Sequence, residues 1–500
     1  MLAKSQQSLM NLSFLKGYNG WEPINDTKKI NFHKKERMTK MKNLKKLLAL
    51  VLVGGMISSL AACGDKKVAD GEVTTVTVWT GNGHDKAFLE EQIEGWNNTV
   101  GKSEGIRIEY VVQDGIANKL DLAFETDQAP DLFSGGTMSK YAELGYIAPY
   151  EDIPGGDKLI EKFEEFLMYG RHIHTDGKTY YLPKSATTYG LIYNKDMFRE
   201  AGIVDENGEP TPPETLDELR EYAKKLTNVE KRKYGYIIAG KTTLIYADDV
   251  MKMSSATSGY ADGYNPKTGV FDFSHEATVM KTMLGIKEDG SCYPGTESTD
   301  NDQARARFAA GDIGMKTAGS YDYGVLTSQF PASIDWGVAP YPTAVEGERK
   351  TQHMGNYGYL MINKKSADEK AEKIAKVLEF FYGDELIEES YKQGIDIPLD
   401  LDVVNKVKLP EEMKQWQEFA KLLSVSQATP IALSRDLQGE RVMRAIYVED
   451  VWSGKVTDVD KVCADYSALQ NEGAKRYAEL HPEYTPEHYI IPDYDSSIKN

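Results

Sequence analysis

Residues 73–79 read Val-Thr-Thr-Val-Thr-Val-Trp, and this stretch, with the chain up to residue 134, decides the fold. Its β-branched residues partly alternate, which is typical of a strand, and residues 106–112 alternate in the same way. Apolar residues recur at helical spacing after Asp85, and residues 115–126 are expected to form a second helix before a short strand at 131–134. The order strand, helix, strand, helix, strand predicts a parallel sheet with helices on its faces.

Later segments carry helix-start signals. Thr215 with Glu218, and Ser366 with Glu369, have the spacing of a capping box, in which the two side chains satisfy free backbone groups at a helix start. The chain after about residue 410 is also expected to be mainly helical. Because no internal repeat is present, a solenoid or propeller is not expected. The sequence therefore predicts an α/β protein.

The N-terminal region contains a targeting signal. Residues 47–62 form an apolar run that follows three lysines and is short for a transmembrane helix. We interpret residues 41–62 as a signal peptide, and residues 1–40 as an extension of the gene model, because a signal peptide begins close to its basic segment. Residues 63–71 are polar and are expected to form a tether.

The end of the signal segment, Leu-Ala-Ala-Cys at 60–63, resembles a bacterial lipobox. The resemblance implies that Cys63 becomes the lipid-modified first residue of the mature protein and anchors it to the membrane. Two or more acyl chains give stable anchoring. The alternative is an ordinary signal peptide with a cysteine near its cleavage site.

Composition narrows the function further. The 500-residue chain has a net charge of −18, and beyond residue 62 it carries 48 basic against 74 acidic side chains, a net charge of −26. This charge argues against nucleic acid as a partner. Only three cysteines are present, which excludes a disulfide-dependent scaffold. Whether Cys292 and Cys463 pair is left open.

A series of seven segments then becomes recognisable, of which the strongest is Leu-Ile-Tyr-Asn-Lys-Asp-Met-Phe-Arg-Glu-Ala-Gly at 191–202. Their order, completed by a helix from Ser366, resembles that of family 1 extracellular solute-binding proteins. These are the sugar-binding lipoproteins of ABC importers, similar in fold to maltose-binding protein. The seven segments are 129–133, 145–149, 176–183, 191–202, 212–219, 308–315 and 336–342.

The resemblance implies a two-lobed periplasmic-binding-protein-like fold of type II, in which each lobe is a sheet flanked by helices. Chain crossings near 186–192 and 355–360 are expected to act as hinges. The predicted first lobe consists of 72–187 and 316–357. The predicted second lobe consists of 188–315 and 358–500.

Ligand-binding residues are expected at the positions where this fold would expose them. Sugars offer apolar C–H faces and rings of hydroxyls, so a site needs aromatic side chains together with polar ones. Loops after strands supply two candidates on local grounds, the crossings that the resemblance implies supply four more, and one polar triplet supplies a seventh. These are Asn82, Thr137, Thr187, Tyr189, Asn356, Tyr357 and Arg435. The family commonly places a stacking aromatic after a small pair such as Gly319-Ser320, which implies a role for Tyr321 and, beside it, for Asp322.

The sequence thus predicts a binding protein and not an enzyme, with no cofactor and no metal. It would capture a sugar or oligosaccharide outside the cytoplasm and deliver it to an ABC-transporter permease, as a lipid-anchored monomer. Alternatives are a non-sugar solute (peptide, polyamine or metal) or, less favoured, a glycoside-processing enzyme. Adjacent tyrosines at 180 and 181 could bind iron, but they lie inside a segment interpreted as structural.

Overall fold

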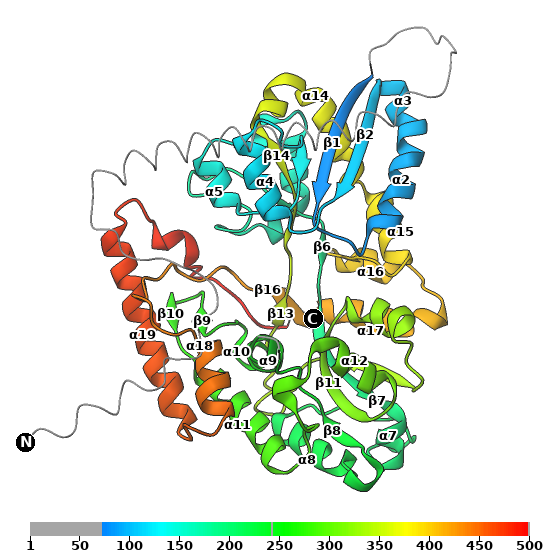
Figure 1. The fold of residues 1–500 in the computed structure, drawn as a ribbon, viewed down its shortest axis with the longest axis vertical. Helices are drawn as coiled ribbons and strands as arrows, with labels where there is room; N and C mark the ends of the chain where they lie inside the picture. The colour runs from blue at the N-terminus through cyan, green and yellow to red at the C-terminus, as the bar shows by residue number, and fades with distance from the viewer. Residues whose placement is uncertain (1–72, 242–243, 499–500) are drawn as a thin grey trace, which may run out of the picture. The chain divides into compact units, whose positions relative to one another are not determined.

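The computed structural model describes residues 73–241 and 244–498, which lie in one compact unit, Glu72–Asn500. The gene-model extension, the signal segment, Cys63 and the tether lie outside the described residues. Within the described part, two sheets with flanking helices carry the fold (Figure 1), as the resemblance implied. Both sheets are mixed and not purely parallel, because strands from later in the chain join them in antiparallel pairs. No helix among the described residues is long and apolar enough to cross a membrane.

The first sheet is built from the opening segment of the chain. β1 (Thr74–Thr80) pairs in parallel with β2 (Ile106–Val112) and with β3 (Leu132–Phe133). Val76 and Val78 of β1 are fully buried because alternate side chains face one side of the strand. The flanking helices are α2 (Lys86–Asn98), α3 (Val100–Glu104), α4 (Ile116–Glu125), α5 (Met138–Glu143) and α6 (Gly156–Phe163).

The rest of the first sheet comes from later in the chain. β14 (Gly358–Asn363) runs antiparallel to β3, to β4 (Ile147–Ala148) and to β5 (Leu182–Pro183). The long helix α14 (Lys364–Phe381) follows β14 directly and packs against β1 and β4. We call this sheet and its helices the first lobe.

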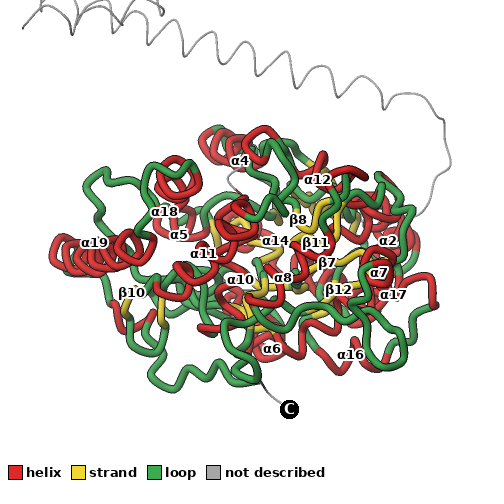
Figure 2. Tube along the Cα trace, turned by 90° about the horizontal axis from the view of Figure 1, so that it is seen from below, coloured by secondary structure: helices red, strands yellow, loops and turns green. Residues whose placement is uncertain are grey.

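The second sheet has the order β12–β7–β11–β8. β7 (Tyr189–Asn194) is buried along its whole length and runs antiparallel to β11 (Ile313–Gly319) and β12 (Trp336–Ala339), while β8 (Tyr234–Tyr236) is parallel to β11. Figure 2 shows these four strands surrounded by helices. We call them the second lobe. Its helices include α7 (Lys195–Glu200), α8 (Leu216–Leu226), α10 (Lys252–Ser258), α11 (Ser274–Glu288), α12 (Asn301–Ala309), α17 (Lys414–Lys421), α18 (Met443–Ile446) and α19 (Val459–Leu480).

The chain passes between the two sheets where Thr187 and Gly355 meet. Their backbones exchange two hydrogen bonds, Thr187 N–H to Gly355 O at 2.8 Å and Gly355 N–H to Thr187 O at 2.9 Å. A further passage contains α15 (Asp384–Lys392), β15 (Ile397–Pro398), which pairs with β6 (Ser185–Ala186), and α16 (Leu401–Lys406). Three passages of the chain therefore run side by side between the lobes.

These pairings correct the predicted lobe boundaries. The strands of 316–357 were assigned to the first lobe, but β11 and β12 pair with β7 in the second sheet. The segment from 358 was assigned to the second lobe, but β14 belongs to the first sheet. Because residue 355 is itself a crossing point, the chain before it lies with the second sheet and the chain after it with the first.

One predicted capping box is confirmed and the other is wrong. Thr215 and Glu218 form the reciprocal hydrogen bonds of the box at the start of α8. At α14 the N-cap is Asn363, and Ser366 lies inside the helix, where its hydroxyl donates to Asp131 Oδ1 at 2.6 Å. The Ser366 hydroxyl therefore binds the buried carboxylate of Asp131 and does not cap the helix start.

The two cysteines of the compact unit do not pair. Both Cys292 and Cys463 are buried free thiols. Cys463 lies 4.0 Å from the sulfur of Met280, and Cys292 lies 3.5 Å from the hydroxyl of Thr296. The described fold therefore depends on packing and hydrogen bonds rather than on a disulfide.

Candidate functional site

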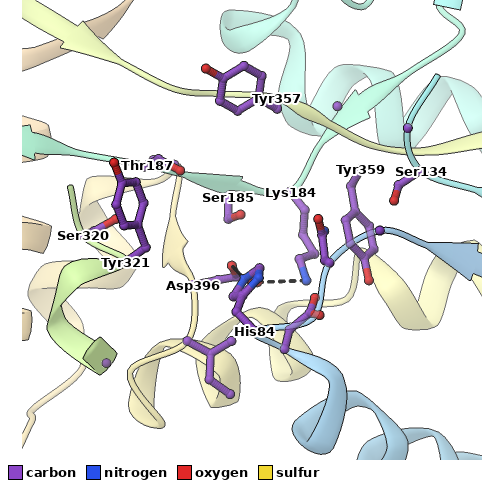
Figure 3. Close-up of a pocket in the computed structure, with 18 of the residues that line it drawn as sticks. His84, Ser134, Lys184, Ser185, Thr187, Ser320, Tyr321, Tyr357, Tyr359 and Asp396 are labelled. Atoms are coloured by element: carbon purple, nitrogen blue, oxygen red, sulfur yellow. Dashed lines mark hydrogen bonds and ion pairs between the residues drawn. The ribbon is translucent and has the colours of Figure 1, made fainter. Parts of the chain in front are cut away.

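A cavity of about 590 Å³ is lined by both lobes and by the segments that cross between them. Its wall is formed by the loops after β1 and β3, the crossing at 184–187, the turn after β11, the start of β14 and the segment before β15. Figure 3 shows side chains from these elements converging on one space. The polar or aromatic residues that line it are Asn82, His84, Asp85, Ser134, Tyr181, Lys184, Ser185, Thr187, Ser320, Tyr321, Tyr357, Tyr359 and Asp396.

The first-lobe loops are held together at the cavity wall. The hydroxyl of Ser134, after β3, donates to the Thr80 hydroxyl at 2.8 Å, and that same oxygen accepts the Asn82 backbone N–H at 3.0 Å. Thr80 is fully buried at the end of β1. Ligands of open α/β sheets bind beyond the carboxyl ends of such strands, so this arrangement presents Asn82 and Ser134 where a solute would lie.

One side of the cavity is aromatic. Tyr321 and Tyr357 are 47 % and 60 % exposed, which is high for tyrosine side chains in a folded chain. An arginine lies near each ring: Arg305 is 5.9 Å from the ring centre of Tyr321, and Arg171 is 5.5 Å from that of Tyr357. Both phenol groups lie on the cavity wall (Figure 3), so a flat solute face can stack there without displacing core packing.

The other side is charged. Lys184 Nζ binds Asp396 Oδ2 at 3.0 Å, and His84 Nε2 lies 3.2 Å from Asp396 Oδ1 (Figure 3). Burial alone would raise the pKa of Asp396, but the charge of Lys184 and the His84 hydrogen bond lower it below the ordinary value. The hydrogen bond to Asp396 is also the main reason that the pKa of His84 is raised. The Asp396 carboxylate is therefore ionised and already shared by two basic side chains.

Asp85 behaves differently from Asp396. It is 1 % exposed, yet within the described chain neither of its carboxylate oxygens has a hydrogen-bond partner. It occupies the N-cap position of α2 without forming a side-chain cap bond. Burial raises its pKa, which Lys184 and His84 partly offset. The hydroxyls of Tyr110 and Tyr359 are buried nearby. Burial is the main cause that raises the pKa of both, and the charge of Asp85 adds to it.

Four of the nine predicted ligand-binding residues line the cavity: Asn82, Thr187, Tyr321 and Tyr357. Tyr189 is buried directly behind the aromatic side. Its ring stacks on His353 at 5.8 Å, makes an edge contact with Tyr321 at 6.4 Å, and has Lys252 Nζ 3.8 Å from its centre. Tyr189 therefore supports the wall without being part of its surface.

The other four predicted residues do not line the cavity. Asp322 is buried and accepts hydrogen bonds from Arg305 Nε at 2.5 Å and Gly319 N–H at 3.1 Å. Asn356 is buried between Arg171 and the carbonyl of Phe166. Arg435 lies over the ring of Phe271 in the second lobe. Thr137 is exposed at the start of α5, two residues beyond Gly135, which does line the cavity.

None of the residues of the charged side was among the predicted ligand-binding residues. His84 and Asp85 follow the first strand, and only the helix after Asp85 was predicted from this stretch. Lys184 comes directly after a segment that was interpreted as structural, and Asp396 has no distinctive sequence context. The available signal was position: His84 and Asp85 belong to the same post-strand loop as Asn82. The Tyr180 and Tyr181 hydroxyls have separate partners, Asp176 and the Gly135 N–H, so they do not form a pair.

Two helix-flanked sheets, three crossing segments and a cavity lined from both sides define a two-lobed, type II periplasmic-binding-protein-like fold. The model of the bacterial extracellular solute-binding protein family matches residues 81–386. The chain therefore belongs to that family, and the relatives described below are binding proteins.

Two relatives and one solved structure illustrate the similarity. The galactooligosaccharide-binding protein of Bacillus subtilis (strain 168) is 24 % identical over 388 residues, which cover 73 % of this chain and 83 % of that protein. The maltotriose-binding protein of Pyrococcus abyssi is 27 % identical over 244 residues, 48 % of each chain. The maltose/maltodextrin-binding domain of Bdellovibrio bacteriovorus, bound to maltotriose, has a TM-score of 0.57 at 16 % identity and covers 81 % of this chain and 100 % of that one.

Proposed function

We propose that this protein captures a sugar or oligosaccharide in the cavity described above. The observation that carries the proposal is the combination of two exposed tyrosines, Tyr321 and Tyr357, with polar groups on the remaining wall. Aromatic faces accept the C–H faces of a sugar, and the polar groups accept or donate hydrogen bonds to its hydroxyls. Relatives named for galactooligosaccharide and maltotriose binding support the same class of solute.

Delivery to a membrane permease is the second part of the proposal. A solute that touches Asn82 of the first lobe and Tyr321 of the second favours a closed form, because ligand shifts an equilibrium only by differential contact with the two states. The paired crossings at Thr187 and Gly355 supply few residues about which the lobes rotate. The closed, loaded form is then the state that an ABC-importer permease recognises.

A binding screen tests the solute class. Full-length chain in a nonionic detergent is heated with individual sugars and oligosaccharides while intrinsic fluorescence follows unfolding. A ligand that binds only the folded state raises the midpoint by mass action. We expect a rise with at least one oligosaccharide, and none with peptides or polyamines. A rise with peptides or polyamines alone, or turnover of the sugar, would contradict the proposal.

Small-angle scattering tests closure. The full-length chain in detergent is measured with and without a saturating amount of the sugar found in the screen, with the scattering of the detergent matched to that of the solvent. A smaller radius of gyration with sugar supports hinge closure. An unchanged radius would mean that the solute binds within one lobe and that the lobes do not move.

Anchoring rests on Cys63, which lies outside the described residues. Replacing it, Cys63→Ala, should leave the precursor without lipid and either uncleaved or released from the membrane. Metabolic labelling with a radioactive fatty acid, followed by membrane fractionation, measures both effects. A Cys63→Ala protein that is cleaved and still membrane-bound would show that the anchor is something else.

A further inference from the structure

On the charged side of the cavity, three side chains that could each bind a metal ion lie close together. The imidazole of His84, the carboxylate of Asp85 and the carboxylate of Asp396 each offer one atom, and these atoms all lie within 4.8 Å of one another. His84 and Asp85 come from the loop between β1 and α2, and Asp396 comes from the passage before β15. No metal site was predicted from the sequence.

The side chain of Asp85 has no close partner that would balance the charge of its carboxylate. Its side chain is almost completely buried and, among the described residues, neither oxygen has a hydrogen-bond partner. A bound water would satisfy the oxygens, but the charge of an ionised Asp85 would then be offset only in part, by Lys184 and His84, and a buried charge without a close partner is costly. The two basic groups nearby, Lys184 and His84, are already bound to Asp396. The cavity therefore has room for one further positive charge beside Asp85.

We propose that His84, Asp85 and Asp396 bind a divalent transition-metal cation, best represented by Zn²⁺, at the charged side of the cavity. An imidazole nitrogen with two carboxylate oxygens is a ligand set that suits zinc. Two atoms bound to one tetrahedral zinc ion lie about 3.4 Å apart, so the most widely separated of the three groups, up to 4.8 Å apart, must approach by about 1.4 Å. The side chain of His84 is 53 % exposed and is free to make that adjustment.

Lys184 sets the character of this site. It holds Asp396 Oδ2 at 3.0 Å, and Oδ1, which lies 3.2 Å from His84 Nε2, can bind the metal once the imidazole has lost its proton. A hydrogen bond to the second oxygen is the usual outer support of a carboxylate ligand. Its positive charge also opposes any second cation. Ca²⁺ and Mg²⁺ depend on many oxygen ligands, and this site offers only two carboxylates beside a lysine. The site therefore favours a metal that gains from imidazole, and Zn²⁺ should bind more tightly than Ca²⁺ or Mg²⁺.

The consequence for binding follows from where the metal would lie. Three protein ligands leave a coordination position open, as in zinc sites that accept water or a substrate oxygen. The three ligand residues line the cavity, so that position is available to an oxygen of a bound solute. Metal binding itself does not depend on the identity of the solute, and it can be tested with the metal alone.

The test uses full-length chain in a nonionic detergent, stripped with EDTA and dialysed, and titrated calorimetrically with ZnCl₂, CaCl₂ and MgCl₂. We expect one Zn²⁺ per chain and at least tenfold weaker binding of the other two ions. His84→Gln and Asp85→Asn should each weaken Zn²⁺ binding at least tenfold. The matched control is His174→Gln, because His174 also lies near two carboxylates, Glu143 at 3.9 Å and Asp176 at 3.7 Å, but away from the cavity.

A second readout keeps the test informative if a variant folds poorly. Asp85→Asn removes the uncompensated charge, so the metal-free variant should melt at a higher temperature than the unaltered chain while losing the rise that Zn²⁺ gives. Absence of one-to-one Zn²⁺ binding would overturn the proposal, as would a loss of affinity in His174→Gln alone. A lower melting temperature for metal-free Asp85→Asn would overturn it too. Binding of glucosamine by the stripped protein without any Zn²⁺ binding would assign the missing charge to an amine instead.

Discussion

The two sides of the cavity differ in how their side chains are exposed and held in the folded protein. On the aromatic side, Tyr321 and Tyr357 are 47 % and 60 % exposed, and an edge contact with Tyr189 supports the Tyr321 ring. On the charged side, Lys184 and Asp396 are bound to one another, and Lys184 is buried against the ring of Tyr359, 4.1 Å from its centre. The comparison suggests a contrast that can be tested: side chains on the charged side are held by contacts within the protein, whereas the aromatic side is open to solvent.

The largest effect is expected when the ion pair between Lys184 and Asp396 on the charged side is removed. Lys184→Met leaves the Asp396 carboxylate with only His84, and removing one partner of a buried ion pair typically costs about 3–5 kcal/mol of the free energy of unfolding. Urea unfolding measures the loss. The control is Lys178→Met, whose ion pair with Asp152 is exposed and should contribute about 1 kcal/mol or less. Equal small losses in both variants would mean that the Lys184 pair is not structural.

The next effect contrasts Asp396 with a buried acid that has no basic partner. Burial, and then the charge of Asp262, raises the pKa of Glu276 from 4.5 to about 8. The folded chain therefore keeps its proton longer than the unfolded chain, and stability falls as the pH rises from about 4.5 to about 8, by about 1.4 kcal/mol per pH unit for one proton.

Glu276→Gln tests this contrast. The amide oxygen can still accept the Gly263 N–H, which the carboxylate accepts at 2.8 Å, but the side chain no longer titrates. Stability measured by urea unfolding should then depend less steeply on pH across that window. A slope identical to that of the unaltered chain would show that Glu276 ionises normally.

A smaller effect tests the aromatic side. Tyr321→Ala should weaken binding of the sugar identified in the screen by more than tenfold, about 1.4 kcal/mol. It should scarcely change the melting temperature of the sugar-free protein, because the ring is already half exposed. Calorimetry and thermal unfolding measure the two effects. Tyr222→Ala, partly exposed and away from the cavity, is the control. A stability loss of several kcal/mol would show that Tyr321 is a core residue.

The smallest effect concerns His84. Its hydrogen bond to Asp396 raises its pKa above 6.5, so the stabilisation from its protonated form is complete below 6.5 and is lost as the pH rises through the higher, folded value. Its side chain is half exposed, so the step is small. NMR titration of the His84 ring measures the pKa directly. An Asp396→Asn variant should return that pKa toward 6.5, and an unchanged value would contradict the assigned cause.

Local sequence patterns determined a good part of this protein. The alternation at 73–79 and 106–112 specified two strands of the first sheet, and the Thr215–Glu218 pattern specified a helix start, because each depends on neighbours a few residues away. The series of family segments specified the two-lobed class, and the post-strand loop pointed to Asn82. Tyr321 was implied by the resemblance, because the family commonly places a stacking aromatic after a small pair.

Only the tertiary structure decided which residues meet. Ser366 has the sequence of a capping residue but binds Asp131, which lies 235 positions away in the chain. Asp322 follows Tyr321 directly, yet it turns inward because Arg305 lies beneath it. Asp396 comes to His84 across 312 positions. A sequence pattern reports spacing along the chain, whereas charges and cavities depend on distance through space, so the charged side of the cavity could be found only in the folded protein.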